Sequence, residues 1–161
     1  MAMSTSNSRQ AAGVTNTLEH RYKATRKRIL VVEDHRLSLV VMHQLLAARG
    51  YDVLQASDGW DAISRARNEQ PDLILMDIRL PDISGLDVTR LLKKDDQTKN
   101  IPIIAVTALV TPAIEANACE SGCDAYVAKP IYIESLMRTV ELFCPACLLH
   151  QLVRNKRGTL V

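Results

Sequence analysis

Five side chains with complementary chemistry stand at the ends of short apolar runs in this sequence. Glu33 and Asp34 follow the first such run, Asp77 the third, Thr107 the fourth and Lys129 the fifth. Polar residues at strand ends are common, which would account for one or two of these positions. That explanation accounts poorly for three carboxylates, a hydroxyl and an ammonium that complement one another. We therefore expect the five side chains to meet in one site.

The residue types at this site favour phosphoryl chemistry supported by a divalent cation. Three crowded carboxylates repel one another, and a cation is the usual remedy. Mg²⁺ keeps several waters while it takes one or two carboxylates and a phosphate oxygen. The carboxylate of Asp77 can act as a nucleophile toward phosphorus and form an aspartyl phosphate. The cation and Lys129 would neutralise charge on the transferred group, and Thr107 can donate to one of its oxygens.

The elements that must position these residues follow from the apolar pattern. Short continuous apolar runs predict strands buried on both faces, at 29–32, 51–56, 73–76, 101–106 and 125–128. The segments that follow the runs have helical spacing and are bounded by capping or breaking residues, among them Asp58 and Ser84 as N-terminal caps and Gly122 at a helix end. They predict helices over about 37–49, 58–69, 86–94, 112–121 and 132–143.

Five strand–helix units in succession predict a parallel sheet covered on both faces. With right-handed crossovers, the expected fold is α/β: a flavodoxin-like, doubly wound, five-stranded sheet of order 2-1-3-4-5. Ligands of such sheets bind beyond the carboxyl ends of the strands, where the strand order switches. The five side chains would lie at that edge.

Length and composition fit one domain with tails. The chain has 161 residues, and only 4% are aromatic, so the core must consist of aliphatic side chains. We expect a disordered basic extension at 1–27, the domain at 28–143, and an extension at 144–161 that could continue the last helix. The sequence shows no secretory signal and no run long enough to cross a bilayer. A cytoplasmic location without membrane insertion is therefore expected.

Charge is distributed unevenly along the chain. Of the net +2, residues 1–28 carry +5 and residues 150–161 carry +3, which leaves −6 for the residues between them. Basic ends can bind nucleic acid or an acidic partner, and solubility alone explains them at least as well.

The segments RILVVED, PDLILMDIRLPDISG, IPIIAVTA and YVAKP resemble those of bacterial two-component response-regulator receiver domains. The likeness covers about 28–143, and it is strongest to single-domain regulators of the CheY and DivK kind, DivK especially. It implies that Asp77 is the phosphoacceptor. It also implies a Mg²⁺ site formed by Asp34, Asp77 and the backbone carbonyl of Arg79, with Glu33 reaching the ion through water.

The resemblance implies roles for four further residues. Thr107 is the switch hydroxyl, and Tyr126 is the aromatic residue that moves inward when Thr107 is drawn to the phosphate. Lys129 pairs with the phosphoryl group, and the bond between Lys129 and Pro130 is expected to be cis.

The resemblance also implies partners. A sensor histidine kinase or a histidine phosphotransfer protein would donate the phosphoryl group. The protein would assist only its own phosphorylation and dephosphorylation, so it is not expected to be an enzyme with an outside substrate. We find no DNA-binding or enzymatic segment after Phe143. Output is expected through contact with a downstream regulatory protein, on the face formed by the fourth helix, the fifth strand and the last helix. That face could also form a homodimer, and the chain could instead serve as one receiver in a relay.

Three positions are less typical of the family. His35 follows the acidic pair, where Asp or Asn is common. Arg79 and Leu109 occupy positions that tune the access of water to the phosphate. Because Leu109 is bulky and apolar, slow self-hydrolysis is predicted.

Other functions compete with this interpretation. A pseudo-receiver that binds partners without phosphate is disfavoured by the complete set of acidic, hydroxyl and lysine residues. A phosphohydrolase would need a second carboxylate where Arg79 stands. Nucleic-acid binding through the basic ends would be salt-dependent. Cys144 and Cys147 form a CxxC motif, which is either a redox or metal motif or a pair of reduced thiols covering an apolar segment.

Overall fold

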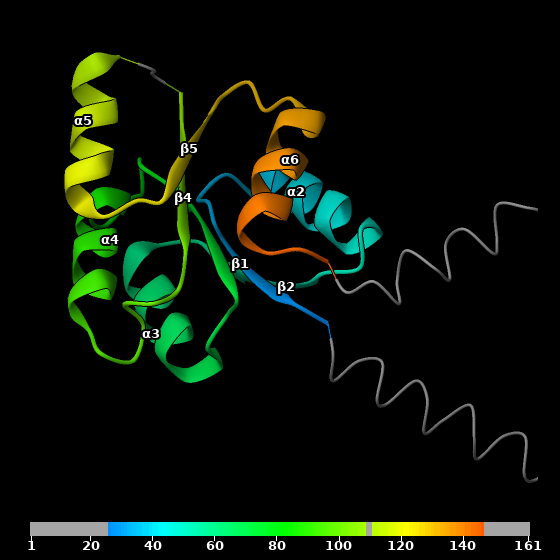
Figure 1. Cartoon of the computed structure of the whole chain (residues 1–161), viewed down its shortest axis with the longest axis horizontal. Coiled ribbons are helices and arrows are strands. Elements are labelled where there is room, and N and C mark those ends of the chain that lie inside the picture. Colours follow the sequence, from blue (N-terminus) through cyan, green and yellow to red (C-terminus); the bar gives the residue numbers. More distant parts are fainter. Residues whose placement is uncertain (1–25, 109–110, 147–161) are drawn as a thin grey trace, which may run out of the picture.

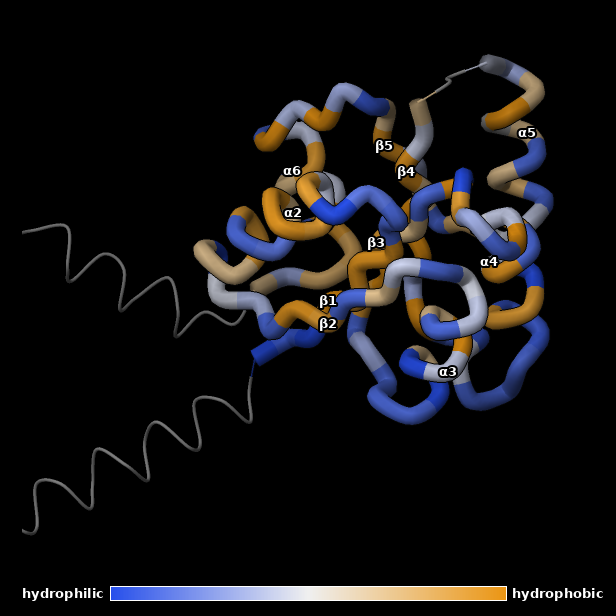
Figure 2. The backbone as a smooth tube through the Cα atoms, turned by 180° about the vertical axis from the view of Figure 1, so that it is seen from behind, coloured by the Kyte–Doolittle hydropathy of each residue, from blue (hydrophilic) through white to orange (hydrophobic). Residues whose placement is uncertain are grey.

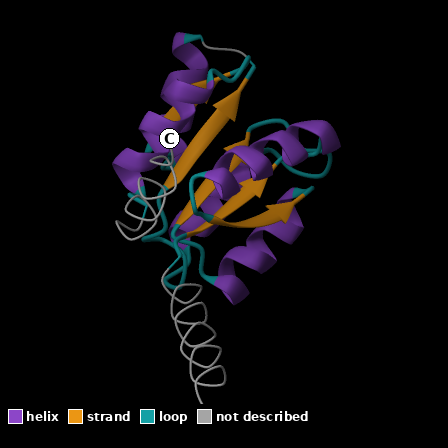
Figure 3. Cartoon of the chain, turned by 90° about the vertical axis from the view of Figure 1, so that its right-hand side faces the viewer, coloured by secondary structure: helices purple, strands orange, loops and turns teal. Residues whose placement is uncertain are grey.

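Five short parallel strands form one sheet in the order β2-β1-β3-β4-β5, within residues 26–108 and 111–146, which the computed structural model describes. The strands are β1 Arg28–Val32, β2 Asp52–Ala56, β3 Leu73–Asp77, β4 Ile103–Thr107 and β5 Ala125–Ala128. Figure 3 shows them running side by side in one direction, so their carboxyl ends share one edge. The predicted flavodoxin-like order is confirmed, and it switches between β1 and β3.

Helices cover both faces of the sheet (Figure 1). α2 Arg36–Ala48 and α6 Ile133–Phe143 lie on one face. α3 Gly59–Glu69 and α4 Gly85–Lys94 lie on the other, and α5 Pro112–Ser121 lies beside α4. Within the described residues, no helix combines the length and the apolar character that spanning a bilayer requires.

The sheet separates two apolar clusters. Because successive strand residues face opposite sides, Ile29 and Val31 of β1 belong to the cluster under α2 and α6. Leu30 and Val32 belong to the cluster under α3 and α4. In Figure 2 the central strands are apolar along the tube, whereas many of the connecting segments are hydrophilic. The central strands β1, β3 and β4 are accordingly buried on both faces, whereas the edge strands β2 and β5 keep partly exposed residues.

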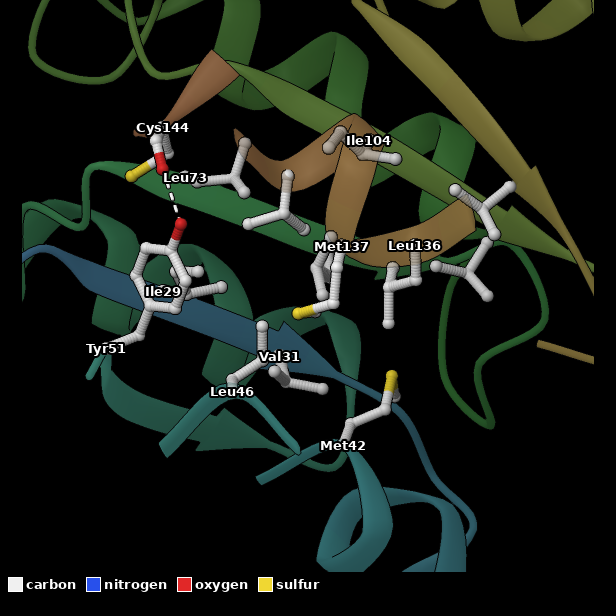
Figure 4. Packing of buried hydrophobic residues seen from close by; sticks show 14 residues of the cluster. Ile29, Val31, Met42, Leu46, Tyr51, Leu73, Ile104, Leu136, Met137 and Cys144 are labelled. Atoms are coloured by element: carbon white, nitrogen blue, oxygen red, sulfur yellow. Dashed lines mark hydrogen bonds between the residues drawn. The ribbon is translucent and has the colours of Figure 1, made fainter. Parts of the chain in front are cut away.

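A hydrogen bond closes the cluster under α2 and α6 at one end, on the left of Figure 4. The hydroxyl of Tyr51, which follows α2, donates to the backbone carbonyl of Cys144 at 2.7 Å. Burial raises the pKa of the Tyr51 phenol to about 12 and the pKa of the Cys144 thiol to about 11. Both groups therefore stay neutral at physiological pH, and Cys144 serves as a small apolar side chain.

α5 buries only small side chains against the rest of the domain. Among its described side chains, only Ala118 and Ser121 are buried. The helix begins at a cap formed by Thr111, whose hydroxyl accepts from the N–H of Ile114, and it ends at Gly122 with φ of 93°. A glycine suits this left-handed position because it has no Cβ.

Element bounds differ from the predicted ones by one or two residues, for identifiable reasons. β2 begins at Asp52 and not at Tyr51, because the N–H of Tyr51 bonds to the carbonyl of Leu46 in the last turn of α2. β4 begins at Ile103 and not at residue 101, because Pro102 has no N–H for the ladder. The expectations for the basic ends, Leu109 and Cys147 lie outside the described residues.

Candidate functional site

A pocket opens at the edge where the strands end, above the switch between β1 and β3. Its charged lining residues are Glu33, Asp34, Asp77, Arg79 and Lys129. The rest of the lining comes from the start of α2 and from the loop after β3: His35, Ser38, Leu80 and Pro81. The structure therefore brings residues from three strand ends into one pocket.

Three carboxylates converge in this pocket. Glu33, Asp34 and Asp77 each offer an oxygen, and these oxygens lie within 4.8 Å of one another. Glu33 is only 1% exposed and Asp77 only 6%, whereas Asp34 is exposed. Glu33 continues the ladder of β1, because its N–H donates to the carbonyl of Ala56 at 3.1 Å. Its carboxylate accepts from the N–H of His35 at 3.2 Å.

Lys129 links two of the three carboxylates. Its Nζ donates to Oε2 of Glu33 and to Oδ2 of Asp77, at 2.6 Å each. Its backbone N–H donates to the carbonyl of Thr107 at 2.7 Å, and the Lys129–Pro130 peptide bond is cis. Burial lowers the pKa of Lys129, but the hydrogen bonds and charges of Asp77 and Glu33 outweigh it, so the pKa lies above 10.5. The ammonium is charged throughout the physiological range.

Asp77 is held from its own loop as well. Its Oδ1 accepts from the N–H of Arg79 at 3.0 Å. Gly85, the first residue of α4, lies against the backbone carbonyl of Asp77, and a Cβ at this position would collide with it. The N–H of Gly85 donates to the carbonyl of Ile78 at 2.9 Å, which closes the loop. Glycine is required here for close approach.

The two residues expected to act as a switch lie beyond the carboxylate cluster. Thr107 ends β4, next to the strand of Asp77, and is 5% exposed. Tyr126 lies on β5 and is 45% exposed, so its ring is on an outer surface. The structure thus gathers the acidic residues and Lys129 at the pocket, with Thr107 on the adjacent strand and Tyr126 further out.

The donor set at the pocket fits a hard divalent cation. Carboxylate oxygens are the ligands that Mg²⁺ prefers, and their negative charge exceeds what the single ammonium of Lys129 neutralises. The open side of the pocket at Asp34 leaves room for solvent ligands.

The parallel sheet and the acidic pocket at its carboxyl edge are those of a receiver domain of two-component signalling. The family model described as the response regulator receiver domain matches residues 29–141. The chain belongs to this family, whose members act in two-component signalling. Its relatives include the polar-differentiation response regulator DivK of Brucella anthropi, which is 41% identical over 117 residues, 73% of this chain and 95% of that protein.

Solved structures agree with this assignment. The receiver domain of the sensor histidine kinase PA1611 from Pseudomonas aeruginosa is 33% identical with a TM-score of 0.69, over 74% of this chain and 98% of that one. That structure has a magnesium ion coordinated in the active-site cleft. A CheY-like receiver domain from Methanospirillum hungatei is 29% identical with a TM-score of 0.69, over 73% of this chain and 93% of that one.

Sequence reasoning missed several contributors to the site. Ser38, Leu80 and Pro81 line the pocket, and Gly85 packs against the backbone of Asp77. Ser38 lies three residues after His35, and its hydroxyl is 3.3 Å from Nδ1 of that residue, so the helical spacing from His35 was a usable signal. The packing of Gly85 depends on how α4 returns to the sheet, and no local pattern reports that.

Proposed function

We propose that Asp77 accepts a phosphoryl group from a phosphohistidine, with a bound Mg²⁺, and that the phosphorylated domain signals by contact with another protein. The observation that carries the proposal is the double bridge of Lys129 to Asp77 and Glu33 within a pocket of three carboxylates. An acceptor carboxylate, an acidic cation site and a fixed ammonium are the groups that phosphoryl transfer to a carboxylate requires.

In this reaction a carboxylate oxygen of Asp77 forms the new O–P bond. The P–N bond to the donor imidazole breaks, and the imidazole nitrogen leaves with the electron pair of that bond. Asp77 is oriented by the N–H of Arg79 and by Lys129. Lys129 supplies positive charge where charge develops on the phosphoryl oxygens. Mg²⁺, when bound by Glu33, Asp34, Asp77 and the carbonyl of Arg79, would supply the remaining neutralisation.

The donor protein has a surface to bind beside the pocket. α2 carries no charged residue between Arg36 and Arg49, and Leu37, Val40 and Val41 are exposed on it. His35 and Ser38, at the start of the same helix, line the pocket. A donor whose histidine enters the pocket beside His35 and Ser38 would contact this apolar surface of the same helix, which makes α2 the docking helix in the proposal.

Output is proposed through the face formed by α5, β5 and α6. Tyr126 of β5 is exposed on this face, and α5 buries few side chains. Phosphorylation would place a phosphoryl group carrying about −1.5 to −2 charges where Asp77 now has a single carboxylate charge. Movement of Thr107 toward the added oxygens would shift the population of conformations on this face. A regulatory protein that prefers one conformation would read the signal.

The experiment is phosphorylation by acetyl phosphate with MgCl₂, followed by intact mass and peptide mapping. We expect one added phosphoryl group, on Asp77, that EDTA prevents. D77N should fold and remain unlabelled, whereas the matched control D96N, at an exposed carboxylate outside the pocket, should be labelled normally. V41E should keep labelling by acetyl phosphate but lose transfer from a phosphorylated histidine kinase that labels the wild type. Labelling of D77N would refute the acceptor assignment.

A further inference from the structure

The loop between β3 and α4, residues 78–84, forms one wall of the pocket. Arg79, Leu80 and Pro81 line the pocket from this loop. The loop also carries the Arg79 carbonyl that the proposed function assigns to the metal. Because a backbone carbonyl is aimed only by the path of its chain, the position of this loop decides whether Arg79 can serve as a ligand.

Asp82 fastens the loop to a neighbouring helix. Its carboxylate accepts from the N–H of Gly59 at 2.8 Å and from the N–H of Trp60 at 2.9 Å. These are the first two residues of α3, more than twenty positions earlier in the chain. The next residue, Ile83, packs against the same helix start: its Cγ1 lies 2.6 Å from the position that a Cβ on Gly59 would occupy. The loop therefore rests on the start of α3 through two adjacent residues.

α3 is a firm support for this attachment. Ala62, Ile63 and Ala66 bury one side of the helix in the cluster under α3 and α4. The N–H groups at its start are those that a helix cannot pair internally, and they favour an anion. Burial opposes ionisation of Asp82, but hydrogen bonds from Gly59, Ile83 and Trp60 lower its pKa below the ordinary value. The carboxylate is thus ionised at neutral pH.

A purely structural role for Asp82 has to be separated from a role in the site. α3 already has an N-cap, since Oδ1 of Asp58 accepts from the N–H of Asp61 at 2.8 Å. Asp58 and Asp82 therefore bind the same helix start with the same chemistry. Only Asp82 belongs to the loop that lines the pocket, so the two residues form a matched pair.

We propose that Asp82 is a positioning residue for the metal site: by holding the loop to α3, it sets the place of the Arg79 carbonyl beside the three carboxylates. This inference rests on the proposed function. It predicts that loss of Asp82 weakens the binding of Mg²⁺ although Asp82 does not touch the ion. Loss of groups that orient metal ligands typically weakens affinity by about tenfold to a hundredfold.

The test is an NMR titration of the full chain with MgCl₂, following the amides of Asp77, Arg79 and Lys129, together with thermal unfolding. We compare wild type with D82A, D82N and D58A. D82A should weaken Mg²⁺ binding about tenfold. D58A should bind Mg²⁺ within about twofold of wild type, although D58A and D82A should both lower Tm by a few degrees. D82N, which can keep one of the two bonds, should fall between wild type and D82A, and it replaces D82A if that variant does not fold.

The outcomes distinguish failure of the proposed function from failure of the positioning role of Asp82. If wild type shows no saturable shift with MgCl₂, the metal site of the proposed function fails. If wild type binds Mg²⁺ and D82A binds it as tightly as D58A does, the positioning role is refuted while the proposed function stands. Weakened binding in both D82A and D58A would assign the effect to general stability of α3 and would also overturn the inference.

Discussion

Lys129→Met removes the one ammonium that links two buried carboxylates. In wild type, Nζ lies 2.6 Å from Glu33 and 2.6 Å from Asp77, and the Lys129 side chain is only 25% exposed. Removing one partner of a buried ion pair costs about 3–5 kcal/mol. Because Lys129 is partly exposed, we expect the lower end, about 3 kcal/mol of unfolding free energy, or a fall in Tm on the order of 10 °C.

The assay is urea unfolding of wild type and K129M in EDTA, repeated in MgCl₂. The matched control is K99M, which removes an ammonium that also lies 2.6 Å from a carboxylate, that of Asp96, but at an exposed position. K99M should change stability little, since exposed pairs contribute little. MgCl₂ should restore part of the loss in K129M, because a bound cation supplies the missing counter-charge.

The pH dependence follows from the raised pKa of Lys129. A group whose pKa is raised in the folded state contributes its full stabilisation below its unfolded pKa, here 10.5, and loses it as pH rises past the folded pKa. The difference in unfolding free energy between wild type and K129M should therefore stay the same from neutral pH to about pH 10 and shrink above that. A loss in K129M no larger than in K99M would refute the reasoning that burial makes this bridge important.

Two further outcomes are expected. Gly85→Ala should destabilise the domain by about 3 kcal/mol or more and prevent labelling at Asp77, because the new Cβ collides with the backbone of Asp77. The matched control is Gly59→Ala, whose Cβ has side-chain atoms of the neighbouring loop and helix as its nearest contacts. It should lower the unfolding free energy measured in urea by about 1 kcal/mol. In the native protein at pH 8, Cys144 should resist alkylation while exposed Cys119 reacts, because Cys144 is 2% exposed and its pKa is about 11. The measurement is mapping of the modified peptides. Alkylation of Cys144 as fast as that of Cys119 would mean that the end of α6 opens readily.

Most of the fold could be predicted because the apolar runs and their interruptions report it locally. Asp58 and Ser84 were expected to cap helices, and each side chain accepts from a backbone N–H of its own helix start. Gly122 was expected to end a helix, and it does so in the left-handed conformation. These signals depend on residues a few positions apart, which a sequence displays directly.

The meeting of Glu33, Asp34, Asp77 and Lys129 could be inferred because parallel strands end at one edge. What could not be inferred was which of them pair. The double bridge of Lys129 depends on side-chain directions at three strand ends, and the attachment of Asp82 to α3 joins residues that are distant in sequence. A Pro–Asp pair predicts a turn, but it does not indicate that the carboxylate caps another element.

The light attachment of α5 has a mechanical consequence. The sheet and its two clusters form a stiff frame, since the central strands β1, β3 and β4 are buried on both faces and closely packed. α5 rests on this frame through Ala118 and Ser121, so tilting or sliding the helix opens no large cavity. Movement at the carboxyl end of β4 would therefore displace α5 and leave the sheet and its two clusters unchanged.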